Sequence, residues 1–422
     1  MDWLSGSIAL LRDRGLQPLP RIESYRRFGG THPETAALTN VLAARDHVAP
    51  HTGRPFSEAM LFGIGGGLGM GYILWQFGQH RGQRDARVLV LAFQHSWQYS
   101  DRYVEGICRR LGLGYRFSTT GSPRVAGRTL DDALADSDPV VAWVDGASMP
   151  YLQLPEAMRG HYAHVLAVCG TGVDGVQVDD LAAEPFVVSR EVFAEARARI
   201  PSFKHRLLVV EDADEVHLED AIAEGIAACV AQLTSRSESF SLEAIRKWAK
   251  LLTDRTNPKG WPVVFEDRRG LYAALTAVFE AIEVHGAPGG LRGMYRDFLV
   301  EAAGVTNDPR LTQPAERYSA LARQWDALAE EALPDAVPQF TRTKQALRKR
   351  HEVLKQGGEA WRATEALTEE LRGIGVECDR SFPLDDHDTS ALFAALQDRL
   401  QAIYVDEVDA VESLKECVVP SR

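Results

Sequence analysis

The spacing of apolar residues changes near residues 210–220, and this change restricts the fold more than any other feature of the chain. Before it, short apolar runs bounded by Gly, Asp or Pro alternate with helical patterns. After it, almost every segment has helical spacing. A chain of 422 residues also exceeds a usual single core. We therefore expect an α/β domain over residues 1–212 and an all-α domain over residues 213–422.

The same patterns predict the individual elements. In the first half we expect strands at residues 88–93, 139–144, 164–169, 175–179 and 206–210, and helices at residues 34–45, 56–80, 100–111 and 189–198. Asp174-Gly175 is a strong turn signal, so residues 162–179 are expected to form a hairpin. In the second half we expect helices at residues 217–233, 241–253, 270–285, 290–303, 314–331, 339–355, 359–373 and 388–418.

Charge and cysteine content narrow the function. A net charge of -12 argues against broad binding of nucleic acid or anionic membranes. The N-terminal stretch MDWLSGSIALLRDRG is too short and too interrupted for a signal peptide or a membrane span. We expect an amphipathic helix or edge segment there, and a cytoplasmic protein. The five cysteines are scattered and form no CxxC pair, which favours a reduced chain without structural zinc.

Residues 56–72, FSEAMLFGIGGGLGMGY, are unusually rich in glycine. They contain no phosphate-loop sequence, and the dinucleotide pattern GxGxxG fails in every register, so no nucleotide cofactor is expected. Small residues recur four apart, as in Gly63 with Gly67, which lets another backbone approach a helix closely. Because each Gly costs roughly 1 kcal/mol of helix propensity, we expect the segment to serve close packing or to shape a site.

Several stretches resemble a known family. Besides the glycine segment, these are Gly29-Gly30-Thr31-His32-Pro33-Glu34 upstream of it, and a strand starting at His164 followed by one ending at Asp179-Asp180. Together they resemble the N-terminal domain of the butirosin-biosynthesis H family. The second half resembles the helical domain that often follows it. The matching pieces are Arg246-Lys247-Trp248-Ala249, Lys259-Gly260-Trp261-Pro262, Gly289-Gly290-Leu291-Arg292 and Tyr295-Arg296-Asp297-Phe298-Leu299.

The resemblance implies a papain-like α/β fold followed by a helical domain. It implies a nucleophilic cysteine at a helix N-terminus, with a histidine and an aspartate on adjacent strands, and acyl transfer from an acyl carrier protein to an amine in secondary metabolism, as in antibiotic biosynthesis. In this sequence His164 matches the base and Asp180 the orienting acid, with Asp179 the neighbouring alternative. Pro33 matches the cysteine.

Proline has no nucleophilic side-chain group, but it suits the first turn of a helix. The helix start is therefore expected to persist while the covalent step is lost. Thr31 and Thr35 flank the position, and a threonine nucleophile remains an alternative. Cys169 lies five residues after His164, and its opposite parity on a strand predicts a buried core residue on the other face.

Acidic and basic side chains remain at the expected pocket, and they suit general acid–base chemistry. We assign catalytic roles to His164, Asp180, Glu34 and His32, and substrate binding to Glu58, Thr35, Asp46, Gly65 and Gly66. Structural roles stay open for several: a first-turn carboxylate for Glu34, a helix cap for Glu58, and a loop hydrogen-bonder for His32. No HxH or HExxH spacing is present, so no metal is expected.

Three functions remain open. The first is acyl or aminoacyl transfer from a carrier protein without a covalent intermediate. The second is base-catalysed cyclisation, in which an amine displaces a leaving group on a carrier-bound substrate, as in aziridine-type ring formation. The third is a catalytically dead scaffold or binding partner. An acyl or peptidyl carrier protein is the expected partner, a second protein subunit is possible, and the basic residues of 342–355 are candidates for carrier docking or for a solvated helix face.

Overall fold

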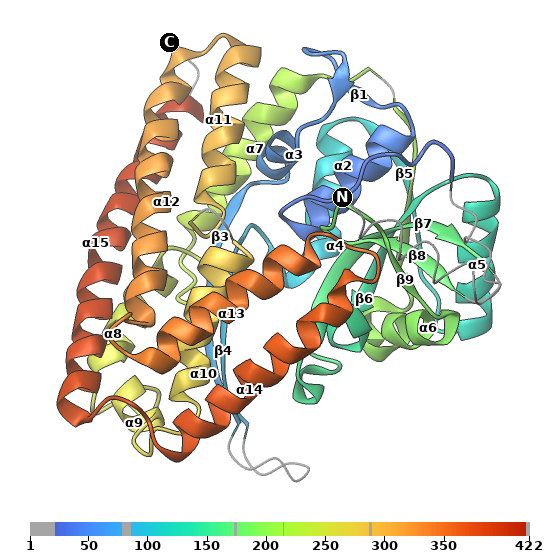
Figure 1. The fold of residues 1–422 in the computed structure, drawn as a ribbon. Helices are drawn as coiled ribbons and strands as arrows, with labels where there is room; N and C mark the ends of the chain where they lie inside the picture. Colours follow the sequence, from blue (N-terminus) through green and yellow to red (C-terminus); the bar gives the residue numbers. More distant parts are fainter. Residues whose placement is uncertain (1–21, 78–85, 173–174, 214, 287–288, 419–422) are drawn as a thin grey trace, which may run out of the picture.

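The computed structural model describes residues 22–77, 86–172, 175–213, 215–286 and 289–418. A sheet-containing part forms one side of the molecule and long helices form the other (Figure 1). The N-terminal segment predicted as a helix or edge lies outside the described residues. Among the described helices, none has the length and apolar character needed to cross a membrane.

A six-stranded antiparallel sheet organises the first half, in the order β5-β10-β6-β7-β8-β9. The strands are β5 (Leu113–Ser118), β6 (Val140–Asp145), β7 (Ala163–Thr171), β8 (Val176–Asp179), β9 (Phe186–Val188) and β10 (Leu207–Ala213). Four predicted strands are confirmed here, as is the pairing of β7 with β8 in the predicted hairpin. The turn residues 173 and 174 lie outside the described part. The sequence analysis missed β5, which is partly polar, and β9, which has only three residues.

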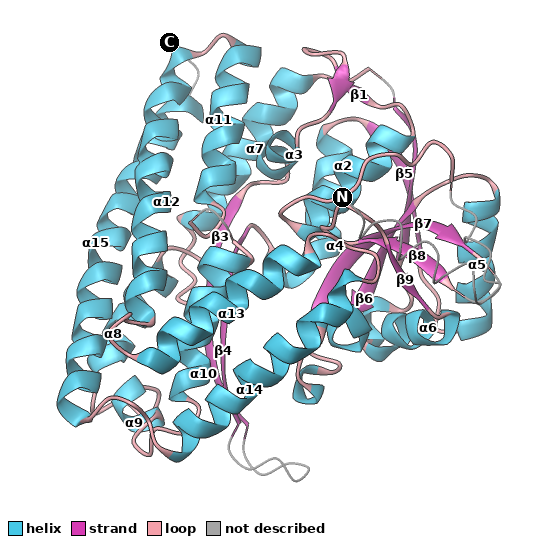
Figure 2. Cartoon of the chain, viewed as in Figure 1, coloured by secondary structure: helices cyan, strands magenta, loops and turns pink. Residues whose placement is uncertain are grey.

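Helices cover both faces of this sheet (Figure 2). Helix α2 (Pro33–Ala44) packs on β6 and β7, and it contacts α4 (Ser100–Arg110). Helices α5 (Pro123–Ala135) and α6 (Arg190–Arg199) pack against β6 and against each other. The predictions for α2, α4 and α6 are confirmed, whereas α5 was missed. Most of α2 is buried, so its N-terminus is fixed over the sheet.

The predicted helix over residues 56–80 is wrong beyond residue 64. Helix α3 (Glu58–Ile64) ends in a turn, and β3 (Leu68–Phe77) then pairs with β4 (Ala86–Gln94), which confirms the strand predicted at 88–93. Gly66 and Gly67 have φ of +105° and +56°, values that only glycine adopts readily and that end the helix. Spacing along the sequence does not show the sign of φ, so the pattern suggested a continuous helix.

The second half is helical, as predicted, and all eight predicted helices are confirmed. They correspond to α7 (Leu218–Leu233), α8 (Glu243–Thr253), α10 (Leu271–Phe279), α11 (Arg292–Thr306), α12 (Thr312–Ala332), α13 (Pro338–Leu354), α14 (Glu365–Arg380) and α15 (Asp386–Val418). A short α9 (Trp261–Val264) was missed. Helix α10 runs directly into a π-helical turn, Glu280–Val284, a geometry found frequently at functional sites.

The β3–β4 hairpin crosses the predicted boundary at residues 212/213. It packs against α7, α8 and α10 of the second half. Tyr72 of β3 stacks on Trp248 with ring centroids 5.5 Å apart, and the indole N–H of Trp261 donates to the Tyr72 hydroxyl at 2.9 Å. The N-terminal sequence thus supplies part of the core of the helical half, and the two halves share one continuous apolar interior.

Candidate active site

The N-terminus of α2 is held by a carboxylate from α3. His32 is the N-cap residue, but its side chain makes no capping hydrogen bond. Glu58 takes that role: it accepts the backbone N–H groups of Thr31 at 3.0 Å and His32 at 2.6 Å. The Thr35 hydroxyl also donates to Glu58, at 3.1 Å. Glu58 and Thr35 therefore belong to a network that fixes the start of α2 at Pro33.

The His32 imidazole is fixed in the same network. Its Nδ1 lies 3.0 Å from the Thr35 hydroxyl, and its Nε2 lies 2.7 Å from the side-chain oxygen of Gln94 at the end of β4. The ring packs edge-on against Phe62 and is only 4% exposed. The Glu34 carboxylate approaches the His32 Nε2 at 3.3 Å. His32 thus links the first turn of α2 to the β3–β4 hairpin.

His164 of β7 and Asp180, the residue directly after β8, form a buried pair. The His164 Nε2 lies 2.8 Å from an Asp180 oxygen, which also accepts the Tyr151 hydroxyl at 2.7 Å. Burial lowers the pKa of His164, but the charge and hydrogen bond of Asp180 and the charge of Glu34 outweigh it, and the pKa is raised above its usual value. Nε2 contacts Asp180, and Nδ1 is the other ring nitrogen of this imidazole.

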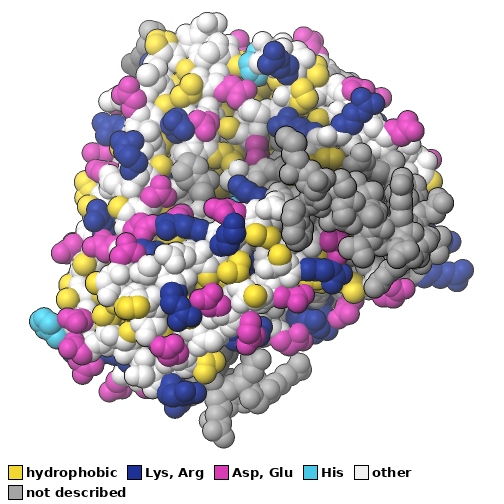
Figure 3. Space-filling model, in the orientation of Figure 1, with side chains coloured by type: hydrophobic (Ala, Val, Ile, Leu, Met, Phe, Trp, Pro, Cys, Tyr) yellow, Lys and Arg dark blue, Asp and Glu magenta, His cyan; other side chains and the backbone are white. Residues whose placement is uncertain are grey.

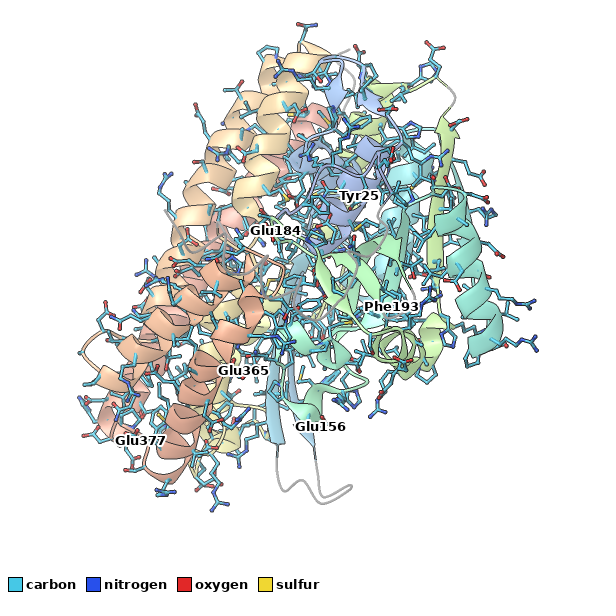
Figure 4. All side chains as sticks on the ribbon, turned by 45° about the vertical axis from the view of Figure 1, so that its right-hand side comes forward. Tyr25, Glu156, Glu184, Phe193, Glu365 and Glu377 are labelled. Carbon is cyan, nitrogen blue, oxygen red and sulfur yellow. The ribbon has the colours of Figure 1, made fainter. Side chains whose placement is uncertain are left out.

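Asp179, the alternative partner for His164, faces a different group of residues. It accepts the hydroxyl of Tyr25, labelled in Figure 4, at 2.6 Å. It also accepts the amide of Asn40 at 2.8 Å and the backbone N–H of Gly29 at 3.1 Å. Burial raises the pKa of Asp179 to about 6 despite these three donors. Asp179 therefore joins α2 to the segment before it, and Asp180 is the carboxylate that contacts His164.

Two further residues extend this site, and sequence reasoning missed them: Tyr162, just before β7, and Glu280 of the second half. Burial raises the pKa of Tyr162 well above its usual value, and the charges of Glu280, Asp180 and Glu34 raise it further. The Tyr162 ring lies 6.1 Å from the His164 ring. Glu280, at the start of the π-helical turn, lies 3.8 Å from Arg350 of α13. Glu280 is an acidic residue in a π-helical turn, and the spacing of residues in the sequence does not reveal such a turn.

Other predicted residues lie elsewhere. Asp46 and the neighbouring His47 follow the C-terminus of α2, about 18 Å from its start for a helix of this length. A Cβ on Gly65 would lie 2.5 Å from the Tyr103 ring, and one on Gly66 would lie 2.9 Å from the His95 ring. Both glycines thus allow aromatic rings to pack beside α3, and the structure gives them no direct place beside His164.

Cys169 is fully buried, as predicted. The parity argument for its direction does not hold, because a register shift between Val168 and Gly170 interrupts the alternation of β7. Its charge contributes to the raised pKa of Tyr25, which places it near the Asp179 network. Within the described ranges, no group of three or more His, Cys, Asp or Glu side chains is arranged to hold a metal ion.

The basic residues of α13, the candidate carrier surface, face carboxylates of the same chain. The five cations of this helix each lie no farther than 3.8 Å from an acidic side chain: Arg342, Lys344, Arg348, Lys349 and Arg350. Figure 3 accordingly shows positive and negative groups interspersed over the helical half, without a large patch of one sign. Exposed pairs of this kind contribute little net field to a docking partner.

Comparison with known proteins yields two family matches. Residues 32–181 match the model of butirosin biosynthesis protein H, N-terminal. Residues 193–355 match a domain of unknown function, DUF4872. The first match contains the start of α2, the β3–β4 hairpin and the His164–Asp180 pair, and the second contains Glu280 and Arg350. No curated protein matches the chain significantly.

Proposed function

We propose that this chain, which carries the N-terminal domain of butirosin biosynthesis protein H followed by the DUF4872 domain, is an enzyme of natural-product biosynthesis. Its substrate is an amino-acyl group held as a thioester on an acyl or peptidyl carrier protein. The resemblance to papain-like enzymes supports this assignment, as does the position of α2, which begins at Pro33 and packs on β7, the strand of His164, while Asp180 follows β8 and contacts His164. Pro33 occupies the position of the nucleophile, so no covalent acyl-enzyme forms.

The observation that carries the proposal is the buried His164–Asp180–Tyr151 chain beside Glu34. Burying ionisable groups is costly unless they are paired. A chain that only needed a stable core would be served as well by apolar side chains at these positions. The geometry suits a general base whose imidazole is oriented by a carboxylate.

In the transfer reaction, His164 Nδ1 removes a proton from the acceptor amine. The nitrogen forms a bond to the thioester carbon, the carbon–sulfur bond breaks, and the departing thiolate takes the proton from the imidazolium. Glu34, Asp180 and Glu280 give the surroundings of Tyr162 and His164 an acidic character that favours an amine or ammonium group on the substrate. Holding the amine beside the thioester contributes by proximity, as in other non-covalent mechanisms.

A second candidate reaction uses the same base on a different bond. The substrate's own amine, deprotonated by His164, attacks a carbon of the same substrate, and a leaving group departs with its electron pair. The absence of a thiol at position 33 favours this cyclisation, because ring closure needs a base and a shaped pocket but no nucleophile. Carrier docking is not expected to depend on the charge of α13, since its cations are already paired.

Intact-mass measurement separates these functions. The protein is incubated with a carrier loaded with an amino-acyl substrate and with a free amine, and both proteins are weighed over time. Transfer leaves the carrier at its unloaded mass, whereas cyclisation lowers the loaded mass by that of the leaving group and one proton. His164→Ala and Glu34→Ala should each lower turnover at least about tenfold, because a general base contributes roughly 10²–10⁴-fold.

The control is another histidine–carboxylate pair of the same chain. His51 lies 3.0 Å from Glu301 of α11 and, in the described structure, makes no hydrogen bond to His164, Asp180 or Glu34, so His51→Gln should leave turnover unchanged. Unchanged turnover in both His164→Ala and Glu34→Ala would contradict the site. No mass change with any loaded carrier would favour the scaffold function, or a site that a second subunit completes.

A further inference from the structure

The helical half contacts the loop that follows Asp180. This loop, residues 181–185, joins β8 to β9, and its Leu181 has a φ of +59°. The backbone N–H of Ala183 donates to the carbonyl of Lys355 at 2.8 Å, just after the end of α13. Figure 4 labels Glu184 where this loop meets the end of that orange helix.

Two glycines make this contact possible. Gly357 and Gly358 have φ of +78° and +55°, in the left-handed region that favours glycine. A Cβ on Gly357 would lie 1.9 Å from the carbonyl oxygen of Glu184 and 2.9 Å from its backbone nitrogen. These are backbone atoms, which cannot rotate away as a side chain can. The turn at 355–358 therefore packs directly against the loop that follows Asp180.

A second contact reaches the other partner of Asp180. Tyr151, which donates to Asp180, lies in the short helical turn η3 (Pro150–Leu152), and Gln153 follows with a φ of +49°. The Gln153 side chain accepts the hydroxyl of Thr368 in α14 at 2.5 Å and donates to the carbonyl of Trp361 at 3.4 Å. The segment bearing Tyr151 is thus attached to the helical half as well.

The two contacts act on one structural unit. The Tyr151 ring stacks on that of Phe186, the first residue of β9, with centroids 3.9 Å apart and planes 3° apart. Tyr151 therefore contacts the residues at both ends of this loop: it donates a hydrogen bond to Asp180 before the loop and stacks on Phe186 after it. The helical half holds this unit from two sides, through Gly357 and through Thr368.

We propose that residues 355–368 of the helical half position the Asp180 carboxylate against His164, with Gly357 and Thr368 as positioning residues. Neither residue touches the reacting atoms. Each acts through the loop or the turn that fixes Asp180, and so sets how strongly His164 holds its proton. An effect on turnover rests on the proposed role of His164 as the base, whereas an effect on imidazole protonation does not depend on any reaction.

Histidine titration by NMR tests this positioning role without a substrate. Full-length protein labelled at histidine ¹³Cε1 is titrated, and the His164 signal is assigned by its absence in His164→Gln. Asp180→Asn gives the reference for complete loss of the carboxylate charge. We expect Gly357→Ala to lower the pKa of His164 towards that reference, by roughly half a unit or more, because displacing Asp180 weakens the charge and hydrogen bond that raise it.

Gly373→Ala is the matched control. Gly373 lies in α14, and a Cβ there would meet nothing within 4 Å, so the His164 pKa should equal that of the wild type. Thr368→Val replaces the hydroxyl by a methyl group and should lower the His164 pKa by a smaller amount. This variant is the test of the proposal if Gly357→Ala does not fold. If Gly357→Ala folds, an unchanged His164 pKa in this variant overturns the proposal. If it does not fold, an unchanged His164 pKa in folded Thr368→Val overturns the proposal. Turnover lost while the His164 pKa is unchanged would overturn it as well, and would leave the proposed base intact.

Discussion

At the residue scale, Pro33 is the position on which the proposed chemistry depends most. It is the first residue of α2, at the N-terminal end of a helix. A thiol at such a position has a lowered pKa, from the helix dipole and from a neighbouring imidazolium. We expect Pro33→Cys to create a reactive thiol that iodoacetamide modifies at pH 6.5, at least about tenfold faster than an ordinary cysteine. Peptide mass spectrometry measures the rate.

Pro123→Cys provides a matched comparison. Pro123 also begins a helix, α5, and is exposed, but the described structure places it outside the His164 network. The natural thiols give little background, because burial raises the pKa of Cys229 to about 11 and that of Cys108 to about 12. Position 33 is less exposed than position 123, so faster modification at 33 cannot come from easier access. A rate at 33 that rises with pH only through the ordinary thiol pKa of about 8.5 would show that no thiolate is stabilised there.

At the element scale, the packing of α3 against α7 rests on Gly225. A Cβ on Gly225 would lie 2.4 Å from the carbonyl oxygen of Gly63 and 2.9 Å from the Cα of Ile64. Alanine should gain about 1 kcal/mol of helix propensity, but overpacking against backbone typically costs about 1–3 kcal/mol. We therefore expect Gly225→Ala to lower the free energy of unfolding by up to about 2 kcal/mol, measured by urea denaturation.

The comparison variant is Gly304→Ala in α11. Nothing lies within 4 Å of a Cβ at Gly304, so only the propensity term acts. This variant should be stabilised by up to about 1 kcal/mol. Stabilisation of Gly225→Ala by the same amount would mean that α3 and α7 do not approach as closely as the structure shows.

At the scale of the whole molecule, the β3–β4 hairpin joins the two halves. Phe93 of β4 packs edge-on against Trp325 of α12 at 5.1 Å, and Tyr72 of β3 stacks on Trp248 of α8. A fragment of residues 1–212 would expose these aromatic faces to water. We expect the full chain to unfold in one calorimetric transition, with equal calorimetric and van't Hoff enthalpies, and the fragment to lack near-UV circular dichroism.

Two well-separated transitions in the full chain, or a fragment that melts cooperatively, would contradict this coupling. The helical half alone offers the complementary test, since without the hairpin it loses the partner of Trp261. Cooperative folding of the two halves would also explain how a contact at Gly357 affects Asp180 without a flexible joint between them.

The sequence by itself determined most elements of the fold and the central pair of the site. Apolar spacing is a local property, so it predicted the helices of the second half and the strands that carry His164 and Asp180. The motif around His32 and Pro33 placed the start of a helix correctly, because proline and a following carboxylate favour a helix N-terminus for local reasons.

Only the tertiary structure decided which side chains meet. Glu58 was expected to bind substrate or to cap its own helix, but it holds the start of α2, since α2 and α3 come together in three dimensions. Asp46 was expected near the site from an extended loop before the glycine segment, yet the whole of α2 separates it from His32. Glu280, Gly357 and Thr368 act from the helical half, through contacts between residues far apart in the chain, which no local spacing records.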